Sequence, residues 1–586
     1  MKTKYVLACL LLCSMLTGCV SCTVSAEETA LSPMNRDELF SARDMQTTWD
    51  EQDVIDIALE NTSITLTEKG VYRLSGQIEN GQIVVDVPKE EKVQLILDGV
   101  SIHCESHAAL YVKQADKVFI TLAPGTENTL SCGETFTQTD ENNVDAALFS
   151  KEDLTLSGEG TLVISSGGHG VVGKDEVTIT AGTYRITSKG HGITAKDSLA
   201  LAGGDFTLVS EKDGLHADHD EDETKGVLYI ENGTFSITAQ QDGIASSGAM
   251  EIAGGTFTLL CGGGSGEMEM APSMQGMGGK GGRGGTPPGG FGGGRGGKGG
   301  FGGFAPGGWN AQTDTQEETT SQKGIKAGGN LLISGGTFTL DTADDALHTN
   351  GSMEISGGTF ALETGDDGLH AEDTLTLKGG EITITECYEG LEGLHIRILS
   401  GNVTLTASDD GLNAAGGTDE SGFGGGFGGG DRFGGFGFGG MDAGNGSIIL
   451  SGGKVHITAY GDGIDANGYF QMDGGNVTVC GPTQGDTATL DYDTTAEING
   501  GTFIGTGASG MMAQAFSGGT QGKIAVQVNN AAAGTSFTLK NADGKQILSH
   551  TPAMDYQVII LSSSDILPGE TYTLQIGTGS GTFTAK

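Results

Sequence analysis

The chain has 586 residues, of which 104 are glycine, and its 31 Lys and Arg against 75 Asp and Glu give a formal net charge of −44. So acidic a chain lacks the basic surface that nucleic-acid binding requires, so that class of function is excluded. The charge suits a protein that binds cations, although solubility and self-repulsion would account for it as well.

The first residues carry the pattern of a secretory signal. Two lysines precede an apolar run from Tyr5 to Met15, which is too short to span a membrane. The segment ends in Leu-Thr-Gly-Cys, which resembles the lipobox of bacterial lipoproteins. This resemblance implies removal of residues 1–18 and diacylation of Cys19, while a chance cysteine after an ordinary signal is the alternative. Residues 19–60 are predicted to form a tether and an N-terminal cap.

The middle of the chain repeats with a period of about 22 residues. Acidic turns stand at Asp345, Asp367, Glu389 and Asp410, and a glycine followed by a β-prone residue recurs in step with them. Two unrelated markers that share one period indicate one coil of a solenoid per repeat. Short alternating strands separated by tight glycine corners predict an all-β fold, a right-handed parallel β-helix over residues 61–520.

The first coils, residues 61–165, show a looser period. Cys104 and Cys132 each end a strand-like run there, which leaves open whether they form a disulfide. Beyond residue 520 the period is lost, and the alternation over residues 521–586 predicts a small antiparallel β cap.

Three insertions interrupt the repeat. Residues 262–310 and 415–446 are Gly-rich, and Asp218–Thr224 is a short acidic segment. All three flank the acidic edge and none interrupts the glycine corner, and insertions gathered on one side of a repeat protein often mark its binding face.

Stacked coils lie about 4.8 Å apart, so the acidic turn residues are expected to form a ladder along one edge. Neighbouring carboxylates at that spacing repel by about 1 kcal/mol in water and by about 3–4 kcal/mol at an effective dielectric of 20. Ca²⁺, which takes about six to eight oxygen ligands, would relieve this repulsion. The expected calcium ligands are Asp213, Asp242, Asp344, Asp345, Asp366, Asp367, Glu389, Asp409, Asp410 and Asp462. The alternatives are that each Asp only caps its own turn, or that histidines hold a transition metal.

A second column follows three residues after each turn position. His216, His348 and His370 in this column are interpreted as outward-facing spacers, and it continues through Glu392, Asn413 and Asp465. Both columns change sign at one coil, through Lys323 and Lys326, directly after the insertion that carries Trp309. The expected ligand-binding residues are Lys323, Lys326, His348, His370 and Trp309, and the alternative for the lysines is charge balance.

Gly70-Val71-Tyr72, the segments 82–86 and 95–100, and the Asp-Gly-Leu-His-Ala coils resemble a bacterial family of secreted carbohydrate-binding β-helix proteins, similar in fold to calcium-dependent pectate lyases. The resemblance implies a calcium-dependent protein that binds plant cell-wall glycans, either pectate (polygalacturonate) or cellulose. The expected protein is a secreted monomer, held by its lipid anchor on the outer face of the bacterial cell membrane, with a polysaccharide as its partner.

Other functions remain open on the residues alone. A pectate lyase-like enzyme would need a basic residue near Ca²⁺ to take the α-proton of a uronate. A polygalacturonase-like hydrolase would use adjacent carboxylates, and a structural surface adhesin would need neither. No catalytic residue is assigned.

Overall fold

The computed structural model describes residues 30–219, 221–222, 224–266, 320–415, 445–485, 487–510 and 512–586. The expectations at Cys19, at Trp309 and within most of the two Gly-rich insertions lie outside these residues. The chain divides into a unit of residues 1–32 and a unit of residues 33–586, and the fold described here is that of the second. Among the described residues, no helix has the length and apolar character needed to cross a membrane.

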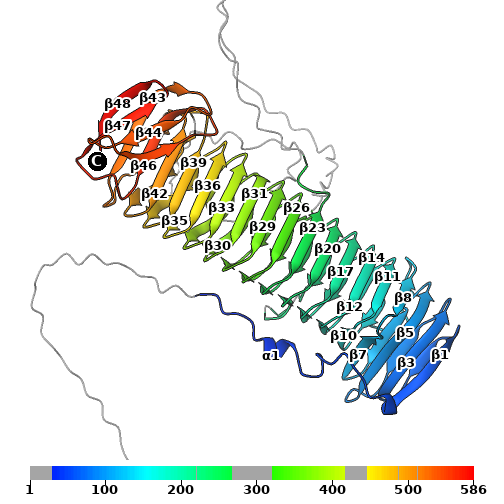
Figure 1. Cartoon of the computed structure of the whole chain (residues 1–586). Helices are drawn as coiled ribbons and strands as arrows, with labels where there is room; N and C mark the ends of the chain where they lie inside the picture. The colour runs from blue at the N-terminus through cyan, green and yellow to red at the C-terminus, as the bar shows by residue number, and fades with distance from the viewer. Residues whose placement is uncertain are drawn as a thin grey trace, which may run out of the picture. The chain divides into compact units, whose positions relative to one another are not determined.

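The second unit is a parallel β-helix, which confirms the fold class predicted from the repeat. Coils follow one another from β1 (Val54–Glu60) to β42 (Thr502–Gly507), and each coil contributes up to three strands (Figure 1). A strand pairs in parallel with its counterpart in the next coil, as β23 (Thr256–Cys261) does with β26 (Thr337–Thr342). The coils therefore present three faces, each a stack of parallel strands.

The long-strand face carries strands of five to seven residues. It contains β8 (Glu127–Cys132), β11 (Thr161–Ser166), β14 (Thr183–Ser188), β17 (Asp205–Ser210), β20 (Thr234–Ala239), β23, β26, β29 (Thr359–Thr364), β31 (Glu381–Cys387), β33 (Asn402–Ala407), β36 (Lys454–Ala459), β39 (Asn476–Cys480) and β42.

The short-strand face follows it in each coil. It contains β2 (Ile64–Leu66), β4 (Ile83–Asp86), β6 (Leu110–Gln114), β9 (Ala146–Ser150), β12 (His169–Gly173), β15 (Ile193–Ala195), β18 (Leu215–Ala217), β21 (Ile244–Ser246), β24 (Ile325–Ala327), β27 (Leu347–Thr349), the first parts of β30 (Leu369–Leu377) and β32 (Leu391–Ile398), β34 (Leu412–Ala414), β37 (Ile464–Ala466) and β40 (Asp491–Tyr492).

The third face closes the coil. It contains β1, β3 (Gly70–Ile78), β5 (Lys92–Cys104), β7 (Lys117–Leu122), β10 (Asp153–Gly158), β13 (Glu176–Ile179), β16 (Ser198–Leu201), β19 (Val227–Ile230), β22 (Met250–Ile252), β25 (Leu331–Ile333), β28 (Met353–Ile355), the second parts of β30 and β32, β35 (Gly446–Leu450), β38 (Gly468–Met472) and β41 (Thr495–Ile498). The ends of β3 and β5 continue onto the long-strand face.

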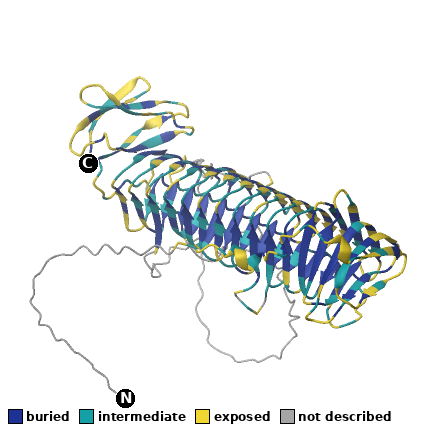
Figure 2. Cartoon of the chain, turned by 60° about the horizontal axis from the view of Figure 1, so that its bottom comes forward, coloured by how far each residue is buried: buried dark blue, intermediate teal, exposed yellow. Residues whose placement is uncertain are grey.

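The core follows directly from the 22-residue period, because each coil places the same residue type at the same inward position. Five phenylalanines stack in consecutive coils with ring centroids 4.5–4.9 Å apart and planes within 3° of parallel: Phe206, Phe235, Phe257, Phe338 and Phe360. Phe257 and Phe338 lie on opposite sides of the first Gly-rich insertion and still stack at 4.7 Å. The insertion therefore leaves the coil register intact, and the buried strands form one continuous interior (Figure 2).

The glycine corners lie between the third face and the long-strand face. Gly336 has φ +112° and Gly380 has φ +96°. A residue with a Cβ is strained in this region, which explains why glycine returns here once per coil.

The segment that precedes the first coil lies against the solenoid. We call residues 33–46 the N-terminal strap; it contains the short helix α1 (Arg36–Leu39) and runs along the third face (Figure 1). The ring of Phe40 is 4% exposed and lies 5.8 Å from Tyr229. Asp44 is 2% exposed, and its Oδ1 lies 2.9 Å from Lys117 Nζ.

For residues 33–46, these contacts correct the tether part of the tether and N-terminal cap predicted over residues 19–60. The strap is held because it offers an apolar ring and a carboxylate to partners on the coils. The solenoid also begins earlier than residue 61, since β1 pairs with β3 along its whole length.

Phe40→Ala is expected to release the strap without unfolding the coils, because Phe40 belongs to a small cluster with Ala200 and Tyr229 that is separate from the main core. Limited trypsin digestion should then cut after Arg36 and Arg43 much faster than in the native protein, while the β-sheet circular dichroism stays unchanged. Met45→Ala is the matched control, since Met45 lies on the strap with 41% exposure. Equal cleavage rates for Phe40→Ala and Met45→Ala would contradict this role of Phe40.

The C-terminal residues form the antiparallel cap that the sequence predicts. Strand β46 (Tyr556–Ser562) pairs with both β42 and β43 (Lys523–Ala531) in antiparallel fashion. A four-stranded antiparallel sheet follows, in the order β45 (Gln546–His550), β44 (Phe537–Lys540), β47 (Thr571–Ile576) and β48 (Gly579–Thr584). The cap has its own apolar core.

Cys104 and Cys132 stack as register partners of β5 and β8, as their positions suggest. Both are buried free thiols, so the pair does not form a disulfide in this structure.

Candidate functional site

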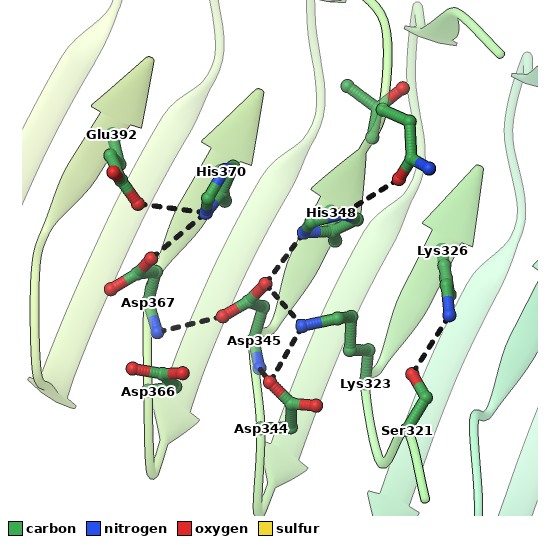
Figure 3. Close-up of polar contacts among 12 residues, drawn as sticks. Ser321, Lys323, Lys326, Asp344, Asp345, His348, Asp366, Asp367, His370 and Glu392 are labelled. Atoms are coloured by element: carbon green, nitrogen blue, oxygen red, sulfur yellow. Dashed lines mark hydrogen bonds and ion pairs between the residues drawn. The ribbon is translucent and has the colours of Figure 1, made fainter. Parts of the chain in front are cut away.

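The predicted ladder stands at the corner between the long-strand face and the short-strand face. In each coil the chain leaves the long strand, passes the turn residue, and then directs one apolar side chain into the core before the second-column residue. Leu347 and Leu369 are fully buried in this way, and each is followed by a histidine. The register pairs His348 with His370 and His370 with Glu392, so the second column runs along the coils as the spacing predicts (Figure 3).

The turn residues are joined by hydrogen bonds from coil to coil. The backbone N–H of Asp367 donates to Oδ1 of Asp345 at 3.1 Å, and that of Glu389 donates to Oδ1 of Asp367 at 3.2 Å. His169 takes the same place with an imidazole, since its Nδ1 accepts from the N–H of His191 at 2.9 Å. We call this chain of contacts the corner ladder. Asp345 and Asp367 thus cap the turn of the following coil and not their own, whereas Asp344 accepts the N–H of Asp345 within its own turn at 2.9 Å.

The corner ladder begins with an imidazole segment. The rings of His191 and His216 are parallel within 1° and 4.1 Å apart, and the ring of His169 stacks on His191 at 5.0 Å. Burial lowers the pKa of His169, His191 and His216 to about 4 in each case. These rings are therefore neutral at pH 7. Oδ2 of Asp213 lies 3.1 Å from Nδ1 of His191 and 3.6 Å from Nε2 of His216.

A lysine segment follows. Lys323 Nζ lies 2.7 Å from Oδ1 of Asp344 and 2.7 Å from Oδ2 of Asp345 (Figure 3). Burial would raise the pKa of Asp345, but the hydrogen bond from His348 and the Lys323 ammonium outweigh it and hold that pKa well below its ordinary value. Burial alone would lower the pKa of Lys323. The charges of Asp345 and Asp344, of which Asp345 has the larger effect, outweigh burial and raise that pKa. Lys323 thus supplies a cation within the ladder.

This placement corrects the expectation that Lys323 receives a sugar carboxylate, because the residue is 7% exposed and its ammonium is held by two aspartates. It favours the charge-balance alternative for this lysine. Lys326 keeps 32% of its side chain exposed, and its Nζ lies 3.2 Å from Ser321 Oγ and 3.9 Å from Oδ2 of Asp242.

Two of the three histidines that were expected to face outward as spacers, His348 and His370, are instead buried, whereas the side chain of His216 is 21% exposed. His348 is 5% exposed, and its Nδ1–H donates to Oδ2 of the Asp345 carboxylate at 2.8 Å. His370 is 1% exposed, and its Nδ1 lies 3.1 Å from Oδ2 of Asp367 and 2.8 Å from Oε2 of Glu392. The short-strand face is filled there by polar contacts between coils, which bury the rings without turning them into the core.

The rest of the ladder is an acid segment. Burial and the neighbouring carboxylates of Asp345 and Asp366 raise the pKa of Asp367 well above its ordinary value. Burial and acidic neighbours raise the pKa of Glu389 to about 8, of Asp410 to about 9 and of Asp465 to about 7. Without a bound cation, this row of side chains cannot be fully ionised at neutral pH.

The structure brings most predicted metal ligands into compact groups. In each of five groups, one ligand atom from each of three side chains lies within 4.8 Å of the others: His191, Asp213 and His216; Asp344, Asp345 and Asp366; Asp345, His348 and His370; Asp367, His370 and Glu392; and Asp410, Asp462 and Asp465. Asp242, Glu389 and Asp409 stand on the ladder but belong to none of these groups.

Sequence reasoning placed Glu392 and Asp465 in the second column without naming them as ligands, and it did not name His191 as a ligand. The signal that could have found them is the spacing of three residues that joins Glu389 to Glu392 and Asp462 to Asp465. It matches the spacing between Asp345 and His348.

The three insertions border the short-strand face. The first Gly-rich insertion follows β23, at the corner ladder. The acidic insertion follows β18 and the second Gly-rich insertion follows β34, both at the other edge of the same face. The glycine corner carries none of them, as the spacing of the repeat predicts.

Comparison with known proteins gives three similarities. A family model for carbohydrate-binding domain-containing proteins matches residues 60–368. A carbohydrate-binding domain-containing protein of Acetivibrio thermocellus is 34% identical over 129 residues, which is 22% of this chain and 45% of that relative. The chain thus matches less than half the length of that relative.

A solved polysaccharide lyase-like protein from C. thermocellum, a gadolinium derivative, is 28% identical, with a TM-score of 0.33 over 36% of this chain and 91% of its own. The family match, by contrast, spans more than half of the 586 residues and includes the imidazole and lysine segments of the corner ladder. The chain therefore belongs to the family of carbohydrate-binding domain-containing proteins.

Proposed function

We propose that this protein binds polysaccharide in a calcium-dependent manner, with Ca²⁺ held in the acid segment of the corner ladder. The observation that supports it best is the convergence of Asp410, Asp462 and Asp465, whose carboxylate oxygens lie within 4.8 Å of one another. Carboxylate oxygens are the ligands that Ca²⁺ prefers, and backbone carbonyls and water complete its shell of about six to eight oxygens.

The acid segment suits Ca²⁺ better than the rest of the ladder. In the lysine segment the protein's own ammonium already lies against Asp344 and Asp345. In the imidazole segment two of the three converging groups are nitrogen donors, which Ca²⁺ binds poorly. Bound Ca²⁺ would also ionise Asp410 and Asp465, whose raised pKa values reflect burial beside other acids.

A calcium ion at this edge gives an acidic protein a way to hold an acidic glycan. The uronate carboxylates of polygalacturonate can complete the coordination of a protein-bound Ca²⁺, whereas direct contact with the ladder would be repulsive. Cellulose carries no carboxylate, so it would gain nothing from the ion. We therefore propose polygalacturonate as the preferred ligand, bound along the short-strand face between its insertions.

The lyase alternative gains no support from the lysines. A base that takes the α-proton of a uronate needs a lowered pKa, but two carboxylates raise the pKa of Lys323. Lys326 Nζ lies beside Ser321 and Asp242 at the edge of the lysine segment, away from the acid segment. Binding without cleavage is the proposed activity.

The proposed location is the outer face of the bacterial cell membrane, with diacylated Cys19 as the anchor. The Leu-Thr-Gly-Cys segment supports this location. The strap holds the chain on the third face from Met34 onward and so leaves the short-strand face to the glycan.

Retention of the full chain on immobilised polygalacturonate is expected to require Ca²⁺ and to be lost in EGTA. Asp465→Asn should weaken retention by about tenfold, equivalent to about 1.4 kcal/mol of binding free energy. Asp473→Asn, which removes an exposed acid outside the five groups, is the matched control and should bind as the native protein does.

Retention that EGTA does not change would contradict the proposed calcium dependence. An unsaturated product formed by the native protein would instead favour the lyase.

A further inference from the structure

The imidazole segment contains a second kind of cation site. One ring nitrogen each from His191 and His216 and one oxygen of Asp213 lie within 4.8 Å of one another. We propose that these three side chains bind a divalent transition metal of the Zn²⁺ class, independently of Ca²⁺ and of the glycan.

One nitrogen of each ring lies close to the carboxylate of Asp213. His216 Nδ1 lies 3.1 Å from Thr194 Oγ1 in the preceding coil, while its Nε2 lies 3.6 Å from Oδ2 of Asp213. In histidines that bind metals, a hydrogen bond at the ring nitrogen that does not bind the metal sets the orientation and tautomer of the ring. His191 Nδ1 accepts the backbone N–H of Asp213 at 3.2 Å, so this nitrogen carries a lone pair close to the carboxylate. A metal at this nitrogen would exchange one ladder hydrogen bond for a coordinate bond.

The donor set selects the metal. Two imidazoles and one carboxylate suit Zn²⁺ and its neighbours among the first-row transition metals, whereas Ca²⁺ and Mg²⁺ require oxygen ligands. The side chains of His191, Asp213 and His216 are 12%, 8% and 21% exposed. This partial exposure gives a metal a route of entry and leaves room for a water molecule as a further ligand.

The same residue types recur in the group of Asp345, His348 and His370, but that group differs in one respect. Lys323 Nζ lies 2.7 Å from Oδ2 of Asp345, which places a positive charge against the carboxylate that a metal would need. Among the described residues, no lysine forms an ion pair with Asp213, whose two ion pairs are both with histidines. It is therefore the better transition-metal site.

The ligands come from consecutive coils, His191 from one and Asp213 with His216 from the next. An ion bound to the folded state alone would link these coils and add RT ln(1 + [L]/Kd) to the free energy of unfolding. The corner ladder would then carry three kinds of positive charge along its length: a transition metal, a lysine and Ca²⁺.

The test is calorimetric titration of the full chain, purified without a histidine tag and stripped of metals, with ZnCl₂ in excess CaCl₂. One strong site is expected in the native protein. Binding should be lost in His216→Ala, whose side chain points away from the core, and in Asp213→Asn, which keeps an oxygen for the N–H of Asp242. Thr194→Val should weaken binding by about 10–100-fold, as loss of a supporting hydrogen bond does.

His395→Ala is the matched control. Like His216, His395 forms a hydrogen bond between its Nδ1 and a hydroxyl of another coil, Ser447 Oγ at 2.8 Å, but it belongs to none of the five groups. It should bind Zn²⁺ as the native protein does, and so should Asp465→Asn. Absence of a strong site in the native protein, or binding unchanged by His216→Ala and Asp213→Asn, would overturn the proposal. Co²⁺ absorption gives a second readout, since its visible bands should appear in the native protein and be missing in both site variants.

Discussion

Replacing Lys323 by methionine is expected to lower the free energy of unfolding by about 3–5 kcal/mol in EGTA, the cost of leaving a buried charge without its partner. Methionine keeps most of the length of the side chain and removes its charge. The ammonium lies 2.7 Å from Asp344 and from Asp345, and Asp345 is fully buried, so water cannot replace it. Urea denaturation at pH 7 measures the loss.

Calcium should restore part of this stability in Lys323→Met, because the variant has a pair of carboxylates without their internal cation. At a concentration 100 times the dissociation constant, a bound ion adds about 2.7 kcal/mol. Lys326→Met is the control, since its ammonium is partly exposed and lies 3.9 Å from Asp242; its loss should cost less than about 1 kcal/mol. A Lys323→Met protein as stable as the native one would show that this lysine does not neutralise the ladder.

The solenoid could be predicted because its stability depends on repetition. A 22-residue coil puts one residue type at each inward position, so a periodic sequence and stacked rings such as Phe257 on Phe338 are two views of the same packing. The positions of the residues in both columns could be predicted for the same reason, because they recur once per coil. None of the three insertions disturbs the prediction, because the coils on either side of each insertion stay in register.

The interactions of the ladder side chains could not be read from spacing. Spacing places Lys323 beside Asp345 but does not say whether its flexible chain turns outward or along the ladder, and the two aspartates decide that through charge. The burial of His370 likewise depends on Asp367 and Glu392, which lie in its own and the next coil.

The contacts of the N-terminal strap could not be predicted from the sequence for a different reason. Its contacts join residues far apart in a segment without any period: Asp44 bonds to Thr155, 111 residues away, and Met34 to Glu251, 217 residues away. No local pattern in residues 33–46 signals partners at such separations, so the sequence predicts only a tether and an N-terminal cap there.

The second large effect is expected at Asp410, as a dependence of stability on pH. Burial and the acids Asp409 and Asp462 raise the pKa of Asp410 from 3.8 to about 9 in the folded protein. Between these values the folded state holds a proton that the unfolded state has released, so this group stabilises the fold fully below about pH 4. That contribution is lost as the pH rises towards the folded value.

Asp410→Asn removes the titration and keeps an oxygen to accept the N–H of Asp462. In EGTA, the stability of the native protein relative to this variant should therefore fall steadily from pH 5 to pH 9 in urea denaturation. One pKa unit corresponds to about 1.4 kcal/mol, so even a fraction of the shift gives a measurable slope. Asp473→Asn, at an exposed acid, should show no such slope relative to the native protein.

Calcium should reverse this dependence, because Ca²⁺ binds the ionised carboxylate and its affinity rises as the proton leaves. The stabilisation by saturating Ca²⁺ should thus be larger at pH 8 than at pH 5 in the native protein, and much smaller at both in Asp410→Asn. Equal stabilisation by Ca²⁺ at the two pH values would contradict binding at Asp410. A flat pH dependence in EGTA would show that its carboxylate is already ionised, which would require another cation in the acid segment.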